Sequence, residues 1–132
     1  MDAHTPGPWR WEFNASSKTV QLCGGRPKFD LMIMDFTRFG MNGAAPRFVE
    51  RPGPGHEIME RCEKFAEVVP GREHHARWFK TVNHPDARLM AAAPDLFDLV
   101  LQYRNDLNHP PTADSRERRL AAIDAAIAKV TG

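Results

Sequence analysis

The sequence predicts an α+β fold, in which an antiparallel sheet of three to five strands packs against C-terminal α-helices. Two observations predict it. Apolar and polar residues alternate with a period of two in segments between residues 9 and 36, as they do in strands. From residue 85 onward, apolar residues recur every three or four positions, which is the period of a helix. Strands that precede helices along the chain, rather than alternating with them, favour this fold class.

The length and composition predict a single domain over residues 1–132. The first part, 1–55, is expected to hold the sheet and a long Gly/Pro loop, and 56–132 to be mainly helical. Hydrophobic residues make up 42% of the chain and charged residues 27%, which is ordinary for a globular protein. The formal net charge of +1 gives no general attraction to nucleic acid or membranes and argues against an acidic nucleic-acid mimic.

The start of the chain and its few cysteines predict where in the cell the protein is located. The first residues lack the apolar run of a signal peptide, and no stretch is apolar enough to span a membrane. The two cysteines, Cys23 and Cys62, are too few for a disulfide scaffold. We therefore expect a reduced, soluble protein of the cytoplasm.

Three strands are predicted in the first 39 residues. Trp9, Trp11 and Phe13 alternate with charged residues, as in a half-buried strand. "KTVQLC" follows a turn and predicts a second strand. "FDLMIMDFTRF" has apolar residues at both odd and even positions, which is typical of a central strand covered on both faces.

Residues 40–55 predict a long irregular surface loop. Four glycines and three prolines in this stretch exclude a regular helix, although Arg47–Glu50 is a candidate for a short edge strand. Long irregular segments in small domains are often functional. The segment is therefore a candidate partner contact.

Three helices are predicted after the loop. An amphipathic helix, whose end could fray into a strand, is predicted over 56–69 by the helical spacing of Ile58, Cys62, Phe65 and Val69. A second helix begins at Pro85, where proline suits the first helical position, and must kink or split at Pro94. The last helix runs from about residue 114 and carries one apolar stripe, expected to lie against the preceding helix or the sheet: Leu120, Ile123, Ile127 and Val130.

Two motifs resemble a family of small phage and prophage proteins. "HTPGPW" at the start and "HPDARLMAAAPDL" later are similar to that family's TPGPW start and its alanine-rich ARL(I/M)AAAPDL helix. The resemblance covers about residues 4–100 and includes "GREHHARWF". It implies a phage or prophage origin, and it implies no catalytic residue or cofactor. The residues themselves indicate structural roles, since Pro6 and Pro8 fix an extended entry and Trp9 can anchor it.

Metal binding and catalysis are poorly supported. "HEIME" lacks the second histidine of a zinc-protease helix, no paired Cys-x-x-Cys occurs, and Cys62 falls on an apolar stripe. The serines lack the glycine pattern of a nucleophile elbow. We therefore expect no enzyme, metal or cofactor. The soft and acidic ligands considered for a metal are His56, His74, His75, His84, Cys23, Cys62, Glu57, Glu60 and Glu73.

Binding surfaces remain as two alternatives. "GREHHARWFK", residues 71–80, interleaves basic residues with aromatic ones, as nucleic-acid sites do, although nearby glutamates dilute the charge. Methionines and phenylalanines around the loop form either a soft protein-binding surface or plain core. The contact residues predicted from both segments are Arg38, Met41, Arg47, Arg72, His74 and Arg77.

The expected function is that of a small phage-encoded accessory protein that binds a host or phage macromolecule. Its most concrete version is an inhibitor of bacterial defence of the anti-CRISPR type, which contacts a protein or a nucleoprotein defence complex. The alternatives are a nucleic-acid-binding phage protein or, with less support, a small metal- or thiol-dependent enzyme. This expectation rests on origin and size, which is association rather than mechanism.

Overall fold

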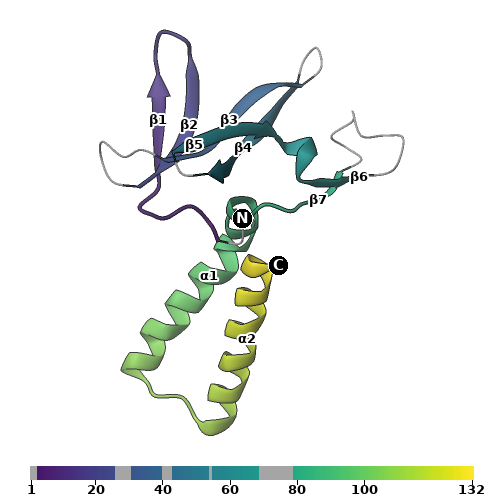
Figure 1. Ribbon diagram of the computed structural model, residues 1–132. Coiled ribbons are helices and arrows are strands. Elements are labelled where there is room, and N and C mark those ends of the chain that lie inside the picture. Colours follow the sequence, from purple (N-terminus) through teal and green to yellow (C-terminus); the bar gives the residue numbers. More distant parts are fainter. Residues whose placement is uncertain (1–2, 26–30, 40–42, 54, 69–78) are drawn as a thin grey trace. The chain divides into compact units, whose positions relative to one another are not determined.

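The computed structural model describes residues 3–25, 31–39, 43–53, 55–68 and 79–132 (Figure 1). The chain divides into two compact units, Met1–Ala87 and Arg88–Gly132. We call the first the sheet unit and the second the helical unit, and each is described by itself. The predicted packing of the helices against the sheet, and the single-domain organisation, stay predictions.

A five-stranded antiparallel sheet dominates the sheet unit. Each strand pairs with its neighbour in sequence, so the sheet is a meander. The three strands predicted from the sequence are confirmed, and β3 is central as expected. The strands, in spatial order, are β1 (Arg10–Asn14), β2 (Thr19–Gly24), β3 (Leu31–Phe39), β4 (Gly43–Gly53) and β5 (His56–Arg61).

The predicted irregular loop over 40–55 is wrong, because most of it forms β4. This strand pairs with β3 from Gly43 to Phe48 and with β5 from Arg47 onward. Pro46 lies before the first β5 pair, where one side of the strand is still an edge, and Pro52 lies within a register shift of the β4–β5 ladder. Proline is tolerated at edges and bulges, so neither residue ends the strand.

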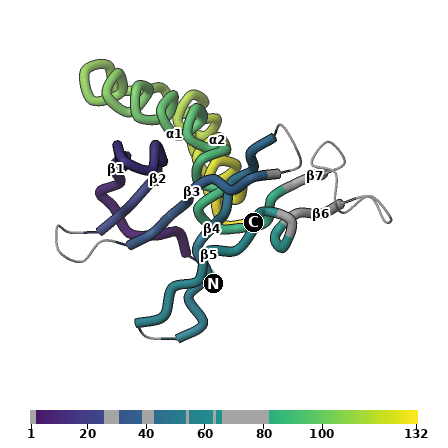
Figure 2. Tube along the Cα trace, turned by 90° about the horizontal axis from the view of Figure 1, so that it is seen from above, coloured from purple at the N-terminus to yellow at the C-terminus, as the bar shows by residue number. Residues whose placement is uncertain are grey.

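The predicted helix over 56–69 is also wrong in the described part of that range. His56–Arg61 forms β5, Cys62–Lys64 forms a 3-10 turn, and Ala66–Val68 forms β6. Strand β6 pairs with β7 (Phe79–Val82). Both views place this pair on the side of β4 and β5, away from β1 (Figure 2). Residues 56–61 pair with β4 rather than form a helix, because the edge of β4 is available directly after the turn that joins the two segments. This pairing outweighs the local helical spacing.

The two C-terminal helices are confirmed. Helix α1 spans Pro85–Asn108 and helix α2 spans Ala113–Thr131, and they form an antiparallel hairpin (Figure 1). Pro94 lies inside α1, so of the two predicted outcomes the split did not occur. Thr112 caps the N-terminus of α2, and its side chain accepts a hydrogen bond from the Ser115 N–H.

Burial confirms part of the predicted core. Ile33 and Met34, adjacent on β3, face opposite sides of the sheet and are both buried, as expected for a central strand. Cys62 is buried as a small apolar residue. The apolar stripe of α2 is not covered by α1, one of its two predicted neighbours, since Leu120 and Ile127 are 56% and 52% exposed.

Candidate functional site

The two motifs that resemble phage proteins meet in the sheet unit. The Thr5 N–H donates a hydrogen bond to Asp86 Oδ1 (2.5 Å), and the Thr5 hydroxyl donates to Asp86 Oδ2 (2.7 Å). Thr5 belongs to the N-terminal motif, and Asp86 lies in the first turn of α1. The Asp86 carboxylate therefore holds the N-terminal segment through both of its oxygens.

His84 extends this contact to the sheet. The Asp86 N–H donates to His84 Nδ1 (3.1 Å), and His84 Nε2 lies 2.6 Å from the carbonyl oxygen of Val49. A carbonyl oxygen can only accept, so Nε2 carries the proton and the ring is neutral. The ring stacks on Phe48, with centroids 5.2 Å apart, and meets Phe65 edge-on. Thr5, His84 and Asp86 are 1%, 2% and 0% exposed, and we call them the buried polar cluster.

Arg51 closes the cluster from β4. Its guanidinium donates to the Thr5 hydroxyl (3.1 Å), to the carbonyl of Met32 (2.9 Å) and to Glu57 (3.1 Å). The Thr5 hydroxyl thus both donates and accepts, as a buried hydroxyl requires. One arginine thereby ties β3, β5 and the N-terminal segment together.

The cluster contains a hydroxyl, an imidazole and a carboxylate, yet its geometry is not that of a catalytic triad. The Thr5 hydroxyl bonds to Asp86 rather than to His84, and both ring nitrogens of His84 bond to backbone groups. A nucleophile needs a base within hydrogen-bond reach and access to substrate. The arrangement therefore stabilises the fold. Sequence reasoning did not find this contact, and the occurrence of both motifs in one chain was the signal that could have linked Asp86 to Thr5.

The predicted contact residues are only partly within the described structure. Met41, Arg72, His74 and Arg77 lie outside the described residues, as does most of "GREHHARWFK", of which Phe79 and Lys80 begin β7. Arg38 and Arg47 are described. They lie on opposite faces of the sheet, since Arg38 is opposite Ala44 whereas Arg47 is opposite Asp35.

Arg47 forms a bidentate ion pair across two strands. Its Nε and Nη2 atoms donate to the two Asp35 oxygens, at 2.8 and 2.5 Å. The hydrogen bonds that Arg47 donates to Asp35 raise the pKa of Arg47; the negative charge of Asp35 raises it further, whereas burial lowers it. Arg47 is thus engaged within the sheet, which weakens its case as a partner contact.

Arg47→Ala is therefore expected to affect stability more than binding. Loss of this half-buried cross-strand pair should lower the free energy of unfolding by about 0.5–1 kcal/mol. Urea titration followed by tryptophan fluorescence measures it, with Asp35→Ala as the matched variant. A loss of partner binding with unchanged stability would instead restore Arg47 as a contact residue.

One face of the sheet exposes large apolar side chains. Trp11 and Phe13 on the edge strand β1 are 62% and 71% exposed, so the predicted half-burial of this strand is wrong for these residues. Phe36 and Ile58 are 47% and 46% exposed. The register puts all four on one face, which we call the aromatic sheet face. A row of paired residues crosses that face: Trp11, Leu22, Met34, Phe48 and Glu60.

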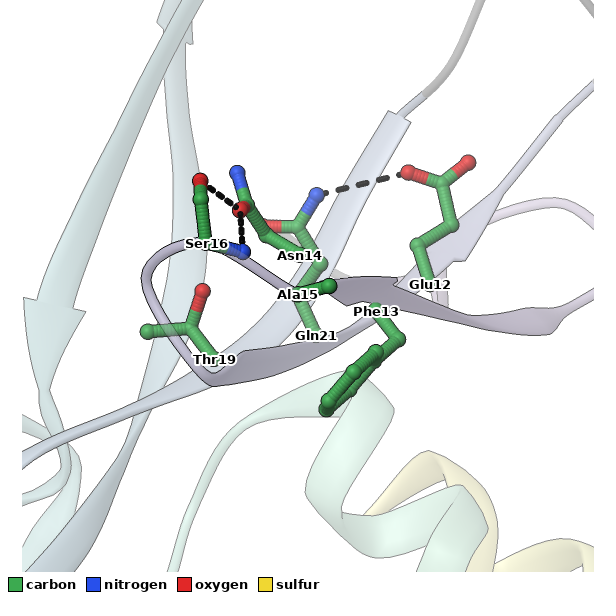
Figure 3. A pocket seen from close by; sticks show the side chains of 7 residues that line it. All are labelled: Glu12, Phe13, Asn14, Ala15, Ser16, Thr19 and Gln21. Atoms are coloured by element: carbon green, nitrogen blue, oxygen red, sulfur yellow. Dashed lines mark hydrogen bonds between the residues drawn. The ribbon is translucent and has the colours of Figure 1, made fainter.

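A hollow of about 510 Å³ adjoins Phe13 at the β1–β2 turn (Figure 3). Glu12 accepts a hydrogen bond from Gln21 at its edge, and this bond is the main cause that lowers the pKa of Glu12. Asn14 accepts hydrogen bonds from the backbone and hydroxyl groups of Ser16, which shapes the turn. Glu12 is the one titratable group among the lining residues, so the hollow holds no acid–base pair.

Metal ligands do not cluster in the described parts of the chain. No group of three His, Cys, Asp or Glu side chains there is placed to hold an ion. Cys23 and Cys62 are buried thiols. His74, His75 and Glu73 of the sequence-based ligand set lie outside the described residues.

Comparison with known protein families identifies a family for the chain. A family model described as Salmonella phage P22 protein Y8K6 matches residues 1–132. The chain belongs to this phage family. The match confirms the phage kinship inferred from the two motifs. No curated protein and no solved structure matches the chain. None of the described helices of this phage protein is long and apolar enough to cross a membrane.

Proposed function

We propose that this phage protein is an accessory protein that binds a host or phage protein through the aromatic sheet face. The observation that carries the proposal is the exposure of Trp11 and Phe13, at 62% and 71%, side by side on one edge strand. An exposed tryptophan and phenylalanine supply large, rigid contact area of the kind found at binding hot spots.

The size of this surface supports a binding role. Trp11 and Phe13, which lie side by side, together expose roughly 300 Å² of largely apolar surface, which is at the lower end of the range where patches mark interaction sites. Leaving such area in water is unfavourable for an isolated protein. A partner that covers it would remove that cost.

The charges on this face favour a protein over nucleic acid. Arg38 is there, but so are Glu50 and Glu60, and Lys64 is held between these two carboxylates at 2.5 and 3.5 Å. A nucleic-acid surface needs an excess of cations to neutralise phosphates. The aromatic sheet face has none among its described residues.

Inhibition of a bacterial defence system, of the anti-CRISPR kind, is the most concrete form of this proposal. Membership of a phage family and the short chain of 132 residues support it. The buried polar cluster gives no support to an enzymatic alternative, because its groups are inaccessible to a substrate. Binding rather than catalysis is therefore the proposed mode of action.

The proposal is tested by affinity capture from infected host cells. A Trp11→Ser/Phe13→Ser variant should retain its fold and bind the captured protein at least about tenfold more weakly, because hot-spot aromatics dominate such interfaces. Phe97→Ser is the matched control, since Phe97 is also 62% exposed but lies in the helical unit.

Two results would count against the proposal. Equal binding by the double variant and the wild type would exclude the aromatic sheet face as the contact. Capture of nucleic acid with steeply salt-dependent affinity would favour the nucleic-acid alternative instead.

A further inference from the structure

The helical unit encloses few of its large apolar side chains. Ala92 and Ala126 are its buried apolar residues among those described. Two hollows, of about 360 and 270 Å³, lie between α1 and α2 and are lined mainly by short or polar side chains. A hairpin this small and this loosely filled has little core of its own.

Large apolar side chains instead point into solvent from both helices. We call six of them the helical apolar face, with exposed fractions from 39% to 68%. On each helix they are three or four positions apart, which is the spacing that packs helices into bundles. The six are Val100, Tyr103 and Leu107 on α1, and Leu120, Ile123 and Ile127 on α2.

The two stripes lie on the same side of the hairpin. Ion pairs between Asp106 and Arg119 (2.5 Å) and between Asp95 and Lys129 (2.6 Å) mark the side on which each helix faces the other. Viewed from its own N-terminus, each helix carries its stripe about a quarter to a third of a turn clockwise from that side. Because the helices are antiparallel, equal clockwise rotations bring both stripes to one side.

We propose that two copies of this chain associate through their helical apolar faces and form a four-helix bundle. The six side chains expose roughly 600 Å² per copy, so pairing would bury about 1,200 Å², the lower limit for a specific stable interface. A two-fold axis parallel to the helices lays α1 of one copy against α2 of the other. Every neighbouring pair of helices is then antiparallel, as in up-down bundles.

Charged residues beside the helical apolar face favour a second copy of the chain as the partner that covers it. The two ion pairs set Asp106 level with Arg119 and Asp95 level with Lys129, so Arg104 is level with Ala121. Arg104 is therefore within one helical turn of the level of Asp124. In the proposed dimer, both side chains flank the contact between α1 and the partner's α2. Arg104 and Asp124 take part in none of the ion pairs observed among the described residues.

Sedimentation equilibrium of the full chain, from low-micromolar to sub-millimolar concentration, tests the proposal. The wild type should dimerise, and Val100→Lys/Ile127→Lys should weaken association at least about a hundredfold by burying two charges per copy. Phe97→Lys/Leu101→Lys is the matched control, since these residues are also exposed but point away from the helical apolar face. A wild type that stays monomeric throughout, or a control as impaired as the test variant, would overturn the proposal.

A charge exchange tests the arrangement of the two copies. Arg104→Glu and Asp124→Arg should each weaken dimerisation by about tenfold, because each replaces two attractions per dimer with two repulsions. The double variant should regain the wild-type dissociation constant within about threefold. Lack of recovery in the double variant would overturn the proposed pairing of α1 with the partner's α2.

Discussion

Asp86→Ala is expected to lower the free energy of unfolding by about 3–4 kcal/mol. The variant removes both acceptors that hold Thr5, and it leaves the Thr5 N–H and the guanidinium of Arg51 around an emptied buried space. Asp86 itself is fully buried, so water cannot readily replace its hydrogen bonds.

Urea titration followed by tryptophan fluorescence measures this change. All three tryptophans, Trp9, Trp11 and Trp78, belong to the sheet unit, so the signal reports on that unit alone. Asp98→Ala is the matched control, because Asp98 is an exposed aspartate further along the same helix. A loss below about 1 kcal/mol for Asp86→Ala would show that the buried polar cluster is not a main source of stability.

Gly24→Ala is expected to lower the free energy of unfolding by about 2–3 kcal/mol. A Cβ at this position would lie 2.7 Å from the Pro6 carbonyl oxygen, 3.1 Å from Thr5 Cγ2 and 3.2 Å from Ile33 Cδ1. The closest of these is a backbone atom, so the N-terminal segment itself must move. That movement would also disturb the hydrogen bond from the Gly25 N–H to the Pro6 carbonyl, at 3.3 Å.

Gly53→Ala provides the comparison for this substitution. A Cβ there would meet nothing closer than the His56 ring at 3.9 Å, so its effect should stay within about 0.5 kcal/mol. The same urea titration serves both variants. Equal effects of Gly24→Ala and Gly53→Ala would mean that the approach of the N-terminal segment to β2 contributes little to stability.

The buried polar cluster and the aromatic sheet face divide the roles of the sheet unit. The cluster joins the N-terminal segment to the sheet and to the start of α1 through inaccessible polar groups. The aromatic sheet face presents exposed apolar residues on one side of the same sheet. A rigid scaffold that presents a binding surface is the arrangement expected of an accessory binding protein.

Local patterns were enough for some elements but misleading for others. The strands at 9–39 and the helices after residue 85 have periods and end signals that depend on neighbouring residues, and these predictions hold. Pro46 and Pro52 contributed to the prediction of a loop over 40–55, and a helical spacing of apolar residues predicted a helix over 56–69. Residues 43–53 and 56–61 form β4 and β5, because the pairing of β4 with β3 and of β5 with β4 decides what local propensity does not.

The candidate site was harder to predict than the fold. Of the six predicted contact residues, the described structure includes Arg38 and Arg47, and it pairs Arg47 with Asp35. The exposure of Trp11 and Phe13 was not foreseen. Alternation predicts that one face of a strand is apolar, but only neighbouring elements determine whether that face is covered.

The sequence by itself determined the phage kinship, the α+β class, the central place of β3 and the positions of α1 and α2. These depend on motifs, on the period of apolar residues and on end signals within a few positions. Only the tertiary structure decided that β4 is a strand, that Thr5 bonds to Asp86 across 81 residues and that the aromatic sheet face is exposed. The physical reason is that these features arise from contacts between residues far apart in the chain, whose partners no local pattern specifies.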